Sequence, residues 1–239
     1  MSLPINGYGQ GLYSSFSSQW NDYDKESPQW QFFKLLTKPE DVFRYIRSHR
    51  HENGHWARDN LKFALLEMIL IFVLSFVLLL LPGFQFSAEN IFIAILQLIG
   101  INFIIFGLLI SFLFTKFLNK FGLASRSYRE SRQDVEFRFC FDAFCNGYTA
   151  IIADFLVGYP IIYLIGLVFS NSLFTLILPN TLLCFAGCHF LYLFIQTLNV
   201  LPFIKKLPFL LFCVPVILTY VLSTIFHWPI VRGWIFCLF

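Results

Sequence analysis

The residues that most resemble a catalytic group are those of the segment His51-Glu52-Asn53-Gly54-His55, which matches the pattern H-E-x-x-H. In zinc proteases the two histidines share one helix face and bind the metal, while the glutamate acts as the general base. Asn and Gly occupy the middle positions here, and they favour the end of a helix. No third ligand follows at a recognisable spacing. The segment therefore predicts neither catalysis nor a metal, and the rest of the sequence indicates no cofactor.

A second group of polar residues lies inside strongly apolar stretches, and it consists of Glu67, Asn102, Asp154, Asn180 and His189. An ionisable side chain in hydrocarbon costs about 3 kcal/mol or more, so it is usually turned inward and paired. One interpretation is a polar cavity for an ion, a proton or a lipid headgroup. The other is a set of hydrogen-bonded clamps between helices. The clamp is favoured, because no ladder of acidic residues crosses the apolar stretches.

The elements that must position these residues are five apolar stretches. Each is about 20 residues long, which is the length that a helix needs to cross a bilayer. The composition agrees, because 57% of the residues are hydrophobic and only 13% are charged, against about 25% in a soluble domain. We therefore expect an all-α polytopic membrane protein with five transmembrane helices. These span residues 61–81, 91–118, 149–169, 181–201 and 208–226, within a membrane domain of residues 61–239.

The connections between these stretches alternate in charge. The segment before the first stretch, the loop after the second and the loop before the fifth are rich in Lys and Arg, whereas residues 82–90 and 170–180 contain neither. Positive charge stays on the cytoplasmic side of a membrane. The pattern predicts a cytosolic N-terminus and a lumenal or external C-terminus. The net charge of +3 is too small to suggest nucleic-acid binding.

Local signals predict where several helices begin and end. Residues 1–26 are rich in Gly, Ser, Gln and Asn, a composition typical of disorder. Residues 27–60 predict amphipathic helices, with Ser27 as the first N-cap. These basic helices lie either on the anionic membrane surface or against the loop after the second stretch. Pro179-Asn180 predicts an interruption before the fourth span, and it leaves 173–178 as an interfacial turn or a tilted extension.

Short motifs beside the predicted spans carry a family resemblance. They are Trp56-Ala57-Arg58-Asp59, Asp134-Val135-Glu136, Phe141-Asp142-Ala143-Phe144 with Asn146, Asn180-Thr181-Leu182, and Leu201-Pro202-Phe203 with Lys205. In this order the motifs resemble the Unc-fifty (uncoordinated-fifty) family of five-span Golgi membrane proteins, over about residues 28–206. The sequence departs from the family pattern Trp-Ala-Arg-Asp-Asp-Pro, because Asn60-Leu61 follows Asp59.

The resemblance implies a non-enzymatic role in vesicle-mediated protein transport at the Golgi membrane. The partners that it implies are large guanine-nucleotide exchange factors for Arf GTPases and membrane cargo proteins. No catalytic residue comes with the family. The residues themselves leave an alternative open, a lipid- or ion-handling protein that uses Glu67, Asp154 and His189. A water-filled cavity would favour this alternative, whereas a dry bundle under an ordered cytosolic cap would favour the trafficking role.

The motif residues next to the membrane predict such a cap, and they are Trp56, Arg58, Asp59, Asp134, Glu136, Asp142 and Asn146. Arg58 precedes the first span and three carboxylates lie in 134–142, on the same predicted side. A guanidinium can join a carboxylate through two parallel charge-assisted hydrogen bonds. We therefore expect Arg58 to pair with a carboxylate of 134–142. The alternative is that Arg58 binds lipid phosphate.

Overall fold

The computed structural model describes residues 27–53, 55–58, 61–79, 87–122, 134–168 and 172–228. This part of the chain is all-α, which confirms the predicted fold class. The disorder predicted for residues 1–26 lies outside the described residues, and so does Asp59.

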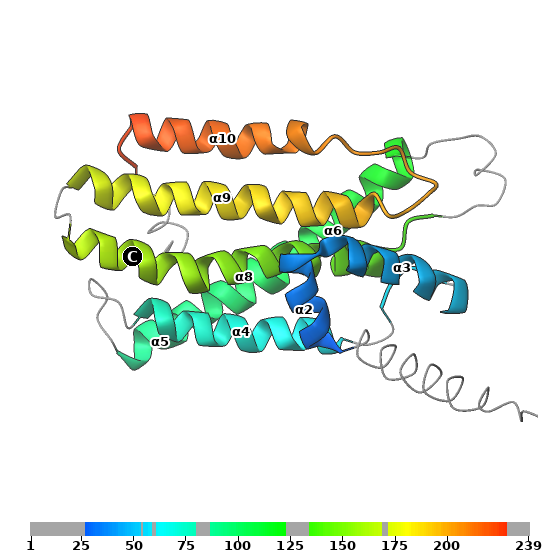
Figure 1. Cartoon of the computed structure of the whole chain (residues 1–239), viewed down its shortest axis with the longest axis horizontal. Coiled ribbons are helices and arrows are strands. Elements are labelled where there is room, and N and C mark those ends of the chain that lie inside the picture. Colours follow the sequence, from blue (N-terminus) through cyan, green and yellow to red (C-terminus); the bar gives the residue numbers. More distant parts are fainter. Residues whose placement is uncertain are drawn as a thin grey trace, which may run out of the picture.

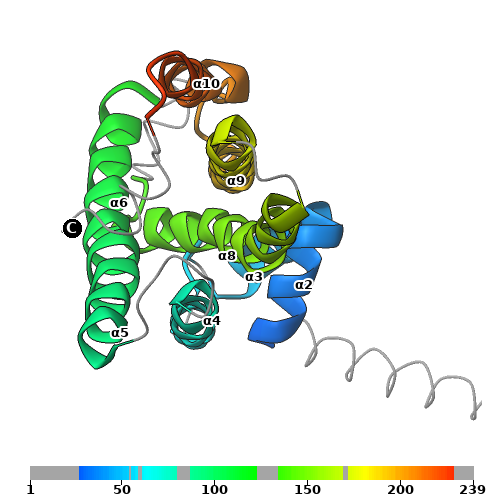
Figure 2. The same ribbon diagram turned by 90° about the vertical axis from the view of Figure 1, so that its left-hand side faces the viewer.

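An antiparallel bundle makes up most of the fold (Figure 1). Its helices are α4 (Lys62–Leu79), the continuous run α5 (Ala88–Ile95), η1 (Leu96–Ile105), α6 (Phe106–Phe117) and η2 (Leu118–Gly122), then α8 (Phe137–Val168), α9 (Ser172–Leu198) and α10 (Phe209–Ile225). Helix α8 is central, because it packs against α4, α6 and α9. Helix α10 lies at the edge beyond α9, and the α5–α6 run crosses the bundle obliquely (Figure 2).

Three helical segments are long and apolar enough to cross a membrane, and they are Ala88–Phe121, Phe137–Ile165 and Leu176–Leu198. Helix α10 is apolar but has only 17 residues, and α4 has 18. The five-span count is therefore not confirmed. Large apolar side chains such as Phe92, Phe112 and Leu210 are exposed on the outside of the bundle. Such a surface suits contact with lipid and not with water. Together with the apolar helices, it indicates a multi-pass membrane protein.

One end of the bundle carries most of the basic residues near the helix termini. There α4 and α8 begin, α6 ends, and the chain passes from α9 to α10 (Figure 1). The basic residues there are Lys62, Lys116, Lys120 and Arg138 near helix termini, and Lys205 and Lys206 in the loop between α9 and α10. We call this the basic end, and it is the end that the charge pattern predicts to be cytosolic.

The structure corrects the predicted starts of two helices. Helix α8 begins at Phe137 and not near Thr149, so the motif around Asp142 lies inside the helix. Helix α9 runs through Pro179, so the predicted interruption was wrong and the preceding residues are a helical extension. A proline inside a membrane helix is tolerated when neighbouring groups satisfy the backbone it leaves unbonded.

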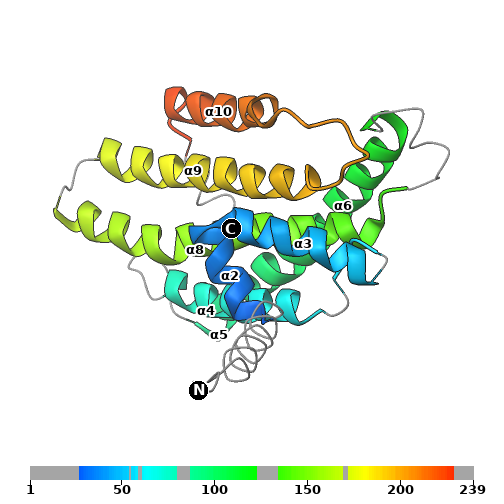
Figure 3. The ribbon, with the colours of Figure 1, turned by 45° about the vertical axis from the view of Figure 1, so that its right-hand side comes forward.

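Two short helices precede the bundle, α2 (Pro28–Thr37) and α3 (Pro39–Asn53). Ser27 caps α2 as predicted, because its hydroxyl accepts from the backbone N–H of Trp30 at 3.2 Å. The pair lies on the flank of the bundle opposite α5–α6, near the basic end (Figures 2 and 3). There α2 packs against α4 and α8, and α3 packs against α9. The helices thus rest on other helices of the chain, and their placement on the anionic membrane surface stays a prediction.

The position where α3 ends shows whether the H-E-x-x-H motif can bind zinc as it does in a protease. The helix stops at Asn53, as the Asn-Gly pair predicts. His51 therefore belongs to the last turn, whereas His55 lies beyond the helix, where its Nδ1 hydrogen-bonds the carbonyl of Ala57 at 2.9 Å. The two histidines do not share one helical face. Among the described residues, no three or more His, Cys, Asp or Glu side chains gather as a metal site would require.

Close contact between α8 and α9 leads to a prediction about Gly147. A methyl group at this position would lie 2.9 Å from the carbonyl oxygen of Phe190 and 2.8 Å from its ring. Gly147→Ala should therefore force the two helices apart and cost about 1–3 kcal/mol of stability. At Gly100 the nearest atom would be a Leu96 methyl at 3.4 Å, so Gly100→Ala should be neutral or stabilising. Thermal unfolding in detergent measures both, and equal midpoints would contradict the prediction.

Candidate functional site

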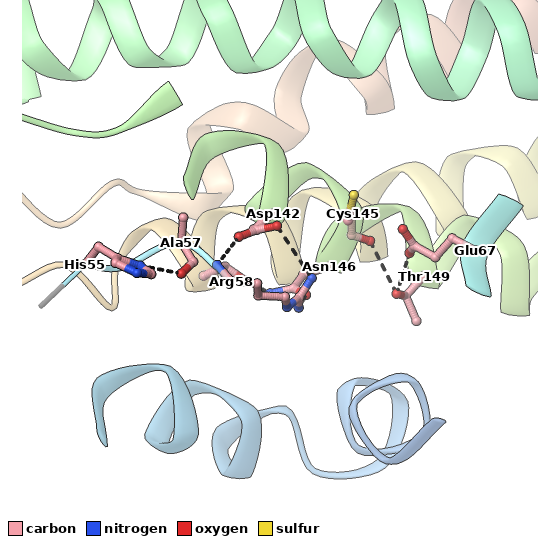
Figure 4. A network of polar contacts seen from close by, with 9 residues as sticks. His55, Ala57, Arg58, Glu67, Asp142, Cys145, Asn146 and Thr149 are labelled. Atoms are coloured by element: carbon pink, nitrogen blue, oxygen red, sulfur yellow. Dashed lines mark hydrogen bonds and ion pairs between the residues drawn. The ribbon is translucent and has the colours of Figure 1, made fainter. Parts of the chain in front are cut away.

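One face of α8 carries a row of polar side chains near the basic end of the bundle (Figure 4). Asp142, Asn146 and Thr149 follow one another at spacings of four and three residues, so they lie on the same side of the helix. Asn146 and Thr149 are fully buried. We call these three residues the polar stripe. A buried polar group must be hydrogen-bonded to be tolerated, so the partners of the stripe determine what packs on α8.

The first partner is Arg58, which precedes α4. Its backbone N–H donates to Asp142 Oδ2 at 2.6 Å, and its guanidinium Nη2 donates to Asn146 Oδ1. Nη1 lies 3.9 Å from Asp142 Oδ1. The guanidinium also stacks on Phe63, with its Cζ 4.1 Å from the ring centroid. The side chains of Arg58 and Asp142 are only 15% and 14% exposed, so this charge pair is largely enclosed by protein.

The predicted pairing of Arg58 with a carboxylate of 134–142 is thereby confirmed, but the expected geometry was wrong. Two parallel guanidinium–carboxylate bonds are not formed, because the backbone N–H occupies one carboxylate oxygen and the guanidinium donates to an amide. Asp134 and Glu136 are exposed. They precede the helix, whereas Asp142 lies on its inward face.

A second pair of contacts fixes the segment before α8. The side chain of Asn119, in η2, accepts from the backbone N–H of Val135 at 2.7 Å and donates to its carbonyl at 3.1 Å. Val135 is buried, although the acidic residues on either side are exposed. This clamp sets where α8 enters the bundle.

Helix α4 meets the polar stripe through Glu67, which is fully buried. Its Oε1 accepts from the hydroxyl of Thr149 at 2.9 Å. The other carboxyl oxygen has no hydrogen-bond partner among the described residues. Asn146 extends the network to α9, because its Nδ2 donates to the hydroxyl of Thr197 at 3.2 Å. The stripe therefore joins α4, α8, α9 and the segment before α4.

Trp56 closes the site at the basic end. Its ring makes edge contacts with Phe139 of α8 and Phe203 of the loop after α9, at centroid distances of 6.4 and 6.3 Å. The residue between Trp56 and Arg58, Ala57, is 1% exposed. The Trp56-Ala57-Arg58 motif thus serves as a buried strap between the N-terminal helices and the bundle.

The remaining intramembrane polar residues form separate contacts. His189 Nδ1 and Asp154 Oδ2 are 3.1 Å apart and join α9 to α8. Asn180 Nδ2 donates to Ser223 Oγ at 3.3 Å and to the carbonyl of Trp228 at 3.0 Å, which joins α9 to the end of α10. Asn102 lies in η1, and its Nδ2 has no hydrogen-bond partner among the described residues. These contacts match the clamp interpretation for Glu67, Asp154, Asn180 and His189.

Four residues of the site were not identified from the sequence, and they are Phe63, Asn119, Thr149 and Thr197. The helical spacing of Asp142, Asn146 and Thr149 was a usable signal. It was missed because the third span was placed from Thr149 onward, which separated these residues. Nothing in the sequence alone indicates that Thr197 or Asn119 faces a distant segment.

This fold and site define a class, the all-α multi-pass membrane proteins. The central helix carries a buried polar stripe, and the described residues include no recognisable catalytic group. A family model described as the UNC-50 family matches residues 15–239. The chain belongs to the UNC-50 family, as its motifs suggested.

Several curated proteins are similar over most of their length. "Protein GMH1" of Saccharomyces cerevisiae is 28% identical over 198 residues, which cover 79% of this chain and 71% of that protein. "Protein unc-50 homolog" of Dictyostelium discoideum is 28% identical, with 84% and 77% covered. The human "Protein unc-50 homolog" is 27% identical, with 88% and 79% covered. No solved structure matches the chain.

The enclosed position of Arg58 predicts that lysine cannot replace it. A lysine keeps the positive charge, but its single ammonium cannot contact Asp142, donate to Asn146 and stack flat on Phe63 at once. We expect Arg58→Lys to lower stability by about 1–3 kcal/mol, because a buried acceptor loses its donor. Arg44→Lys is the control, since Arg44 is 72% exposed and pairs with Asp41 on the surface. If the two variants unfold at the same temperature, the Arg58 contacts do not stabilise the fold.

The bond between Thr149 and Glu67 leads to a second prediction. Thr149→Val keeps the shape of the side chain but removes the hydroxyl that donates to the buried carboxyl. The cost should be about 1–3 kcal/mol, the range for an unsatisfied buried acceptor. Thr219→Val removes an exposed hydroxyl that bonds only within its own helix, to the carbonyl of Pro215, and should change stability by less than about 0.5 kcal/mol. Chemical unfolding in detergent measures the difference, and a silent Thr149→Val would exclude a clamp at Glu67.

Proposed function

We propose that this protein is a non-enzymatic Golgi membrane protein that acts in vesicle-mediated protein transport. It recruits or positions a large Arf guanine-nucleotide exchange factor and supports the trafficking of membrane cargo. The N-terminus faces the cytosol, and the C-terminus faces the lumen. Membership of the UNC-50 family supports this role. The structural observation that carries it is the packing of α2 on α4 and α8 and of α3 on α9, beside the contacts that join Arg58 to the polar stripe.

The attachment matters because a docking surface must be held in one place to position a partner. The inward residues Leu35 and Val42 are buried, so α2 and α3 each present a defined outer face. Phe33, on the outer face of α2, is 66% exposed. Aromatic side chains are enriched at protein interfaces and among the residues that contribute most to binding. This surface is the one that we assign to the exchange factor.

The alternative, lipid or ion handling by Glu67, Asp154 and His189, has less support. Glu67 contacts Thr149, whereas Asp154 contacts His189. The three residues therefore act in two separate helix contacts and not as one constellation. A binding site for a transported ion would be expected to gather them around shared space.

The proposed partner predicts the effect of two matched substitutions. Phe33→Ala should reduce capture of a purified large Arf exchange factor by the full chain about fivefold or more, because an interface aromatic commonly contributes over 1 kcal/mol. Phe92→Ala is the control, since Phe92 is 67% exposed but lies on α5, among the apolar helices. It should leave capture unchanged. Capture is measured with detergent-solubilised protein whose thermal midpoint has been checked.

Equal capture by the wild type and both variants would reject α2 as the docking surface. Failure of the wild-type chain to capture any large Arf exchange factor would reject the proposed partner itself.

A further inference from the structure

A pocket of about 440 Å³ opens at the basic end, between α3 and the loop that joins α9 to α10. Two cationic side chains line it, Arg47 of α3 and Lys206 of the loop. Between them the wall is largely apolar, with contributions from Trp56, Leu201, Pro202 and Ile204. The volume lies within the range of small-molecule sites. The pocket is separate from the polar stripe, although its lining residue Trp56 belongs to the strap.

Within the part of the chain that the structure describes, no acidic side chain neutralises the two cations at this pocket. No carboxylate of the described residues forms an ion pair with Arg47 or Lys206. One turn earlier in α3, by contrast, Arg44 lies 3.3 Å from a carboxylate oxygen of Asp41. Two positive charges beside one cavity attract an anion, and they do so more strongly where an apolar wall excludes water.

The loop side of the pocket is fixed before any ligand arrives. Asn199 accepts from the backbone N–H of Leu207 at 2.8 Å and donates to its carbonyl at 3.3 Å, which closes the loop at its base. Phe203 is buried and contacts the ring of Trp56. A wall that is already ordered loses little conformational entropy when a ligand binds. This arrangement gives the Leu201-Pro202-Phe203 motif a structural role that the polar stripe does not explain.

The position of the pocket indicates where its ligand comes from. The loop lies between two apolar helices, α9 and α10, so the pocket opens where the chain leaves the apolar part of the bundle. Phosphate groups of lipids lie at this depth in a bilayer, and basic pockets beside transmembrane helices bind anionic headgroups. The apolar wall suits the glycerol and ester carbons that adjoin such a phosphate.

We propose that the pocket binds the phosphomonoester headgroup of an anionic phospholipid, with Arg47 and Lys206 as the phosphate ligands. A phosphomonoester carries a charge of about −1.5 to −2 at neutral pH, which two cations match. A phosphodiester such as phosphatidylglycerol carries one charge and should bind more weakly. A zwitterionic headgroup brings its own cation and should not bind.

The test uses the purified full chain in neutral detergent and a fluorescent dioctanoyl phosphatidic acid as the probe, with binding read by anisotropy at an ionic strength of about 0.15 M. Unlabelled dioctanoyl phosphatidic acid should displace the probe, and dioctanoyl phosphatidylcholine should not. The double variant Arg47→Gln/Lys206→Gln should bind about tenfold or more weakly, since two charge-assisted contacts are lost. The matched control Arg44→Gln/Lys205→Gln removes two charges from the same two segments and should retain binding.

Each other outcome decides against part or all of the proposal. If glycerol 3-phosphate or inorganic phosphate displaces the probe as well as phosphatidic acid does, the phosphate site stands but its lipid source is rejected. If phosphatidylcholine competes equally, or if the control variant loses as much affinity as Arg47→Gln/Lys206→Gln, the assignment of the pocket is overturned. Binding of a poly-glutamate peptide without binding of phosphatidic acid would assign the pocket to an acidic protein segment instead. The competition between ligands for the wild-type protein tests the proposal even if a variant fails to fold.

Discussion

The contacts of one guanidinium tie the segment that follows the N-terminal helices to the bundle. A charge as little exposed as that of Arg58 is tolerated only where its donors find acceptors. Asp142, Asn146 and the ring of Phe63 together provide this environment. Since the acceptors lie on α8 and the ring on α4, the contact can form only when these helices and the strap are correctly packed. The site therefore favours one arrangement over others, which is a known role of buried polar groups.

The rest of the polar stripe also joins helices through buried polar contacts, deeper in the bundle. Apolar side chains in hydrocarbon gain little from contact with one another, because lipid offers an equivalent environment. Helix pairs are then distinguished by close packing and by hydrogen bonds. Gly147 allows α8 to approach α9 closely, and Glu67 with Thr149 fixes α4 against α8. Packing and polar contacts thus select the same neighbours for α8.

Much of the architecture followed from the sequence, because apolar length and the N-cap at Ser27 are local properties. The helix-breaking effect of the Asn-Gly pair after His51-Glu52, and the pairing of Arg58 with a carboxylate of 134–142, were likewise predicted correctly. The starts of α8 and α9 were not, because hydropathy marks the apolar part of a helix and not its polar extension. Pro179 was misread for a related reason, since its effect depends on which neighbours satisfy the backbone. Thr197 and Asn119 escaped notice because their partners are distant in the chain.

Two asparagines, Asn180 within α9 and Asn199 just after it, have a consequence for the motion of α10. Asn180 holds the end of α10 through Ser223 and the carbonyl of Trp228, while Asn199 holds the loop before its start. Because α10 is held near both of its ends, these contacts oppose an outward swing of the helix away from α9. The bond to Ser223 also opposes rotation of α10 about its own axis, so bending at Pro215, the proline inside the helix, is the motion that both contacts permit. Such bending changes which side chains near the middle of α10 face the lipid while both of its ends stay attached.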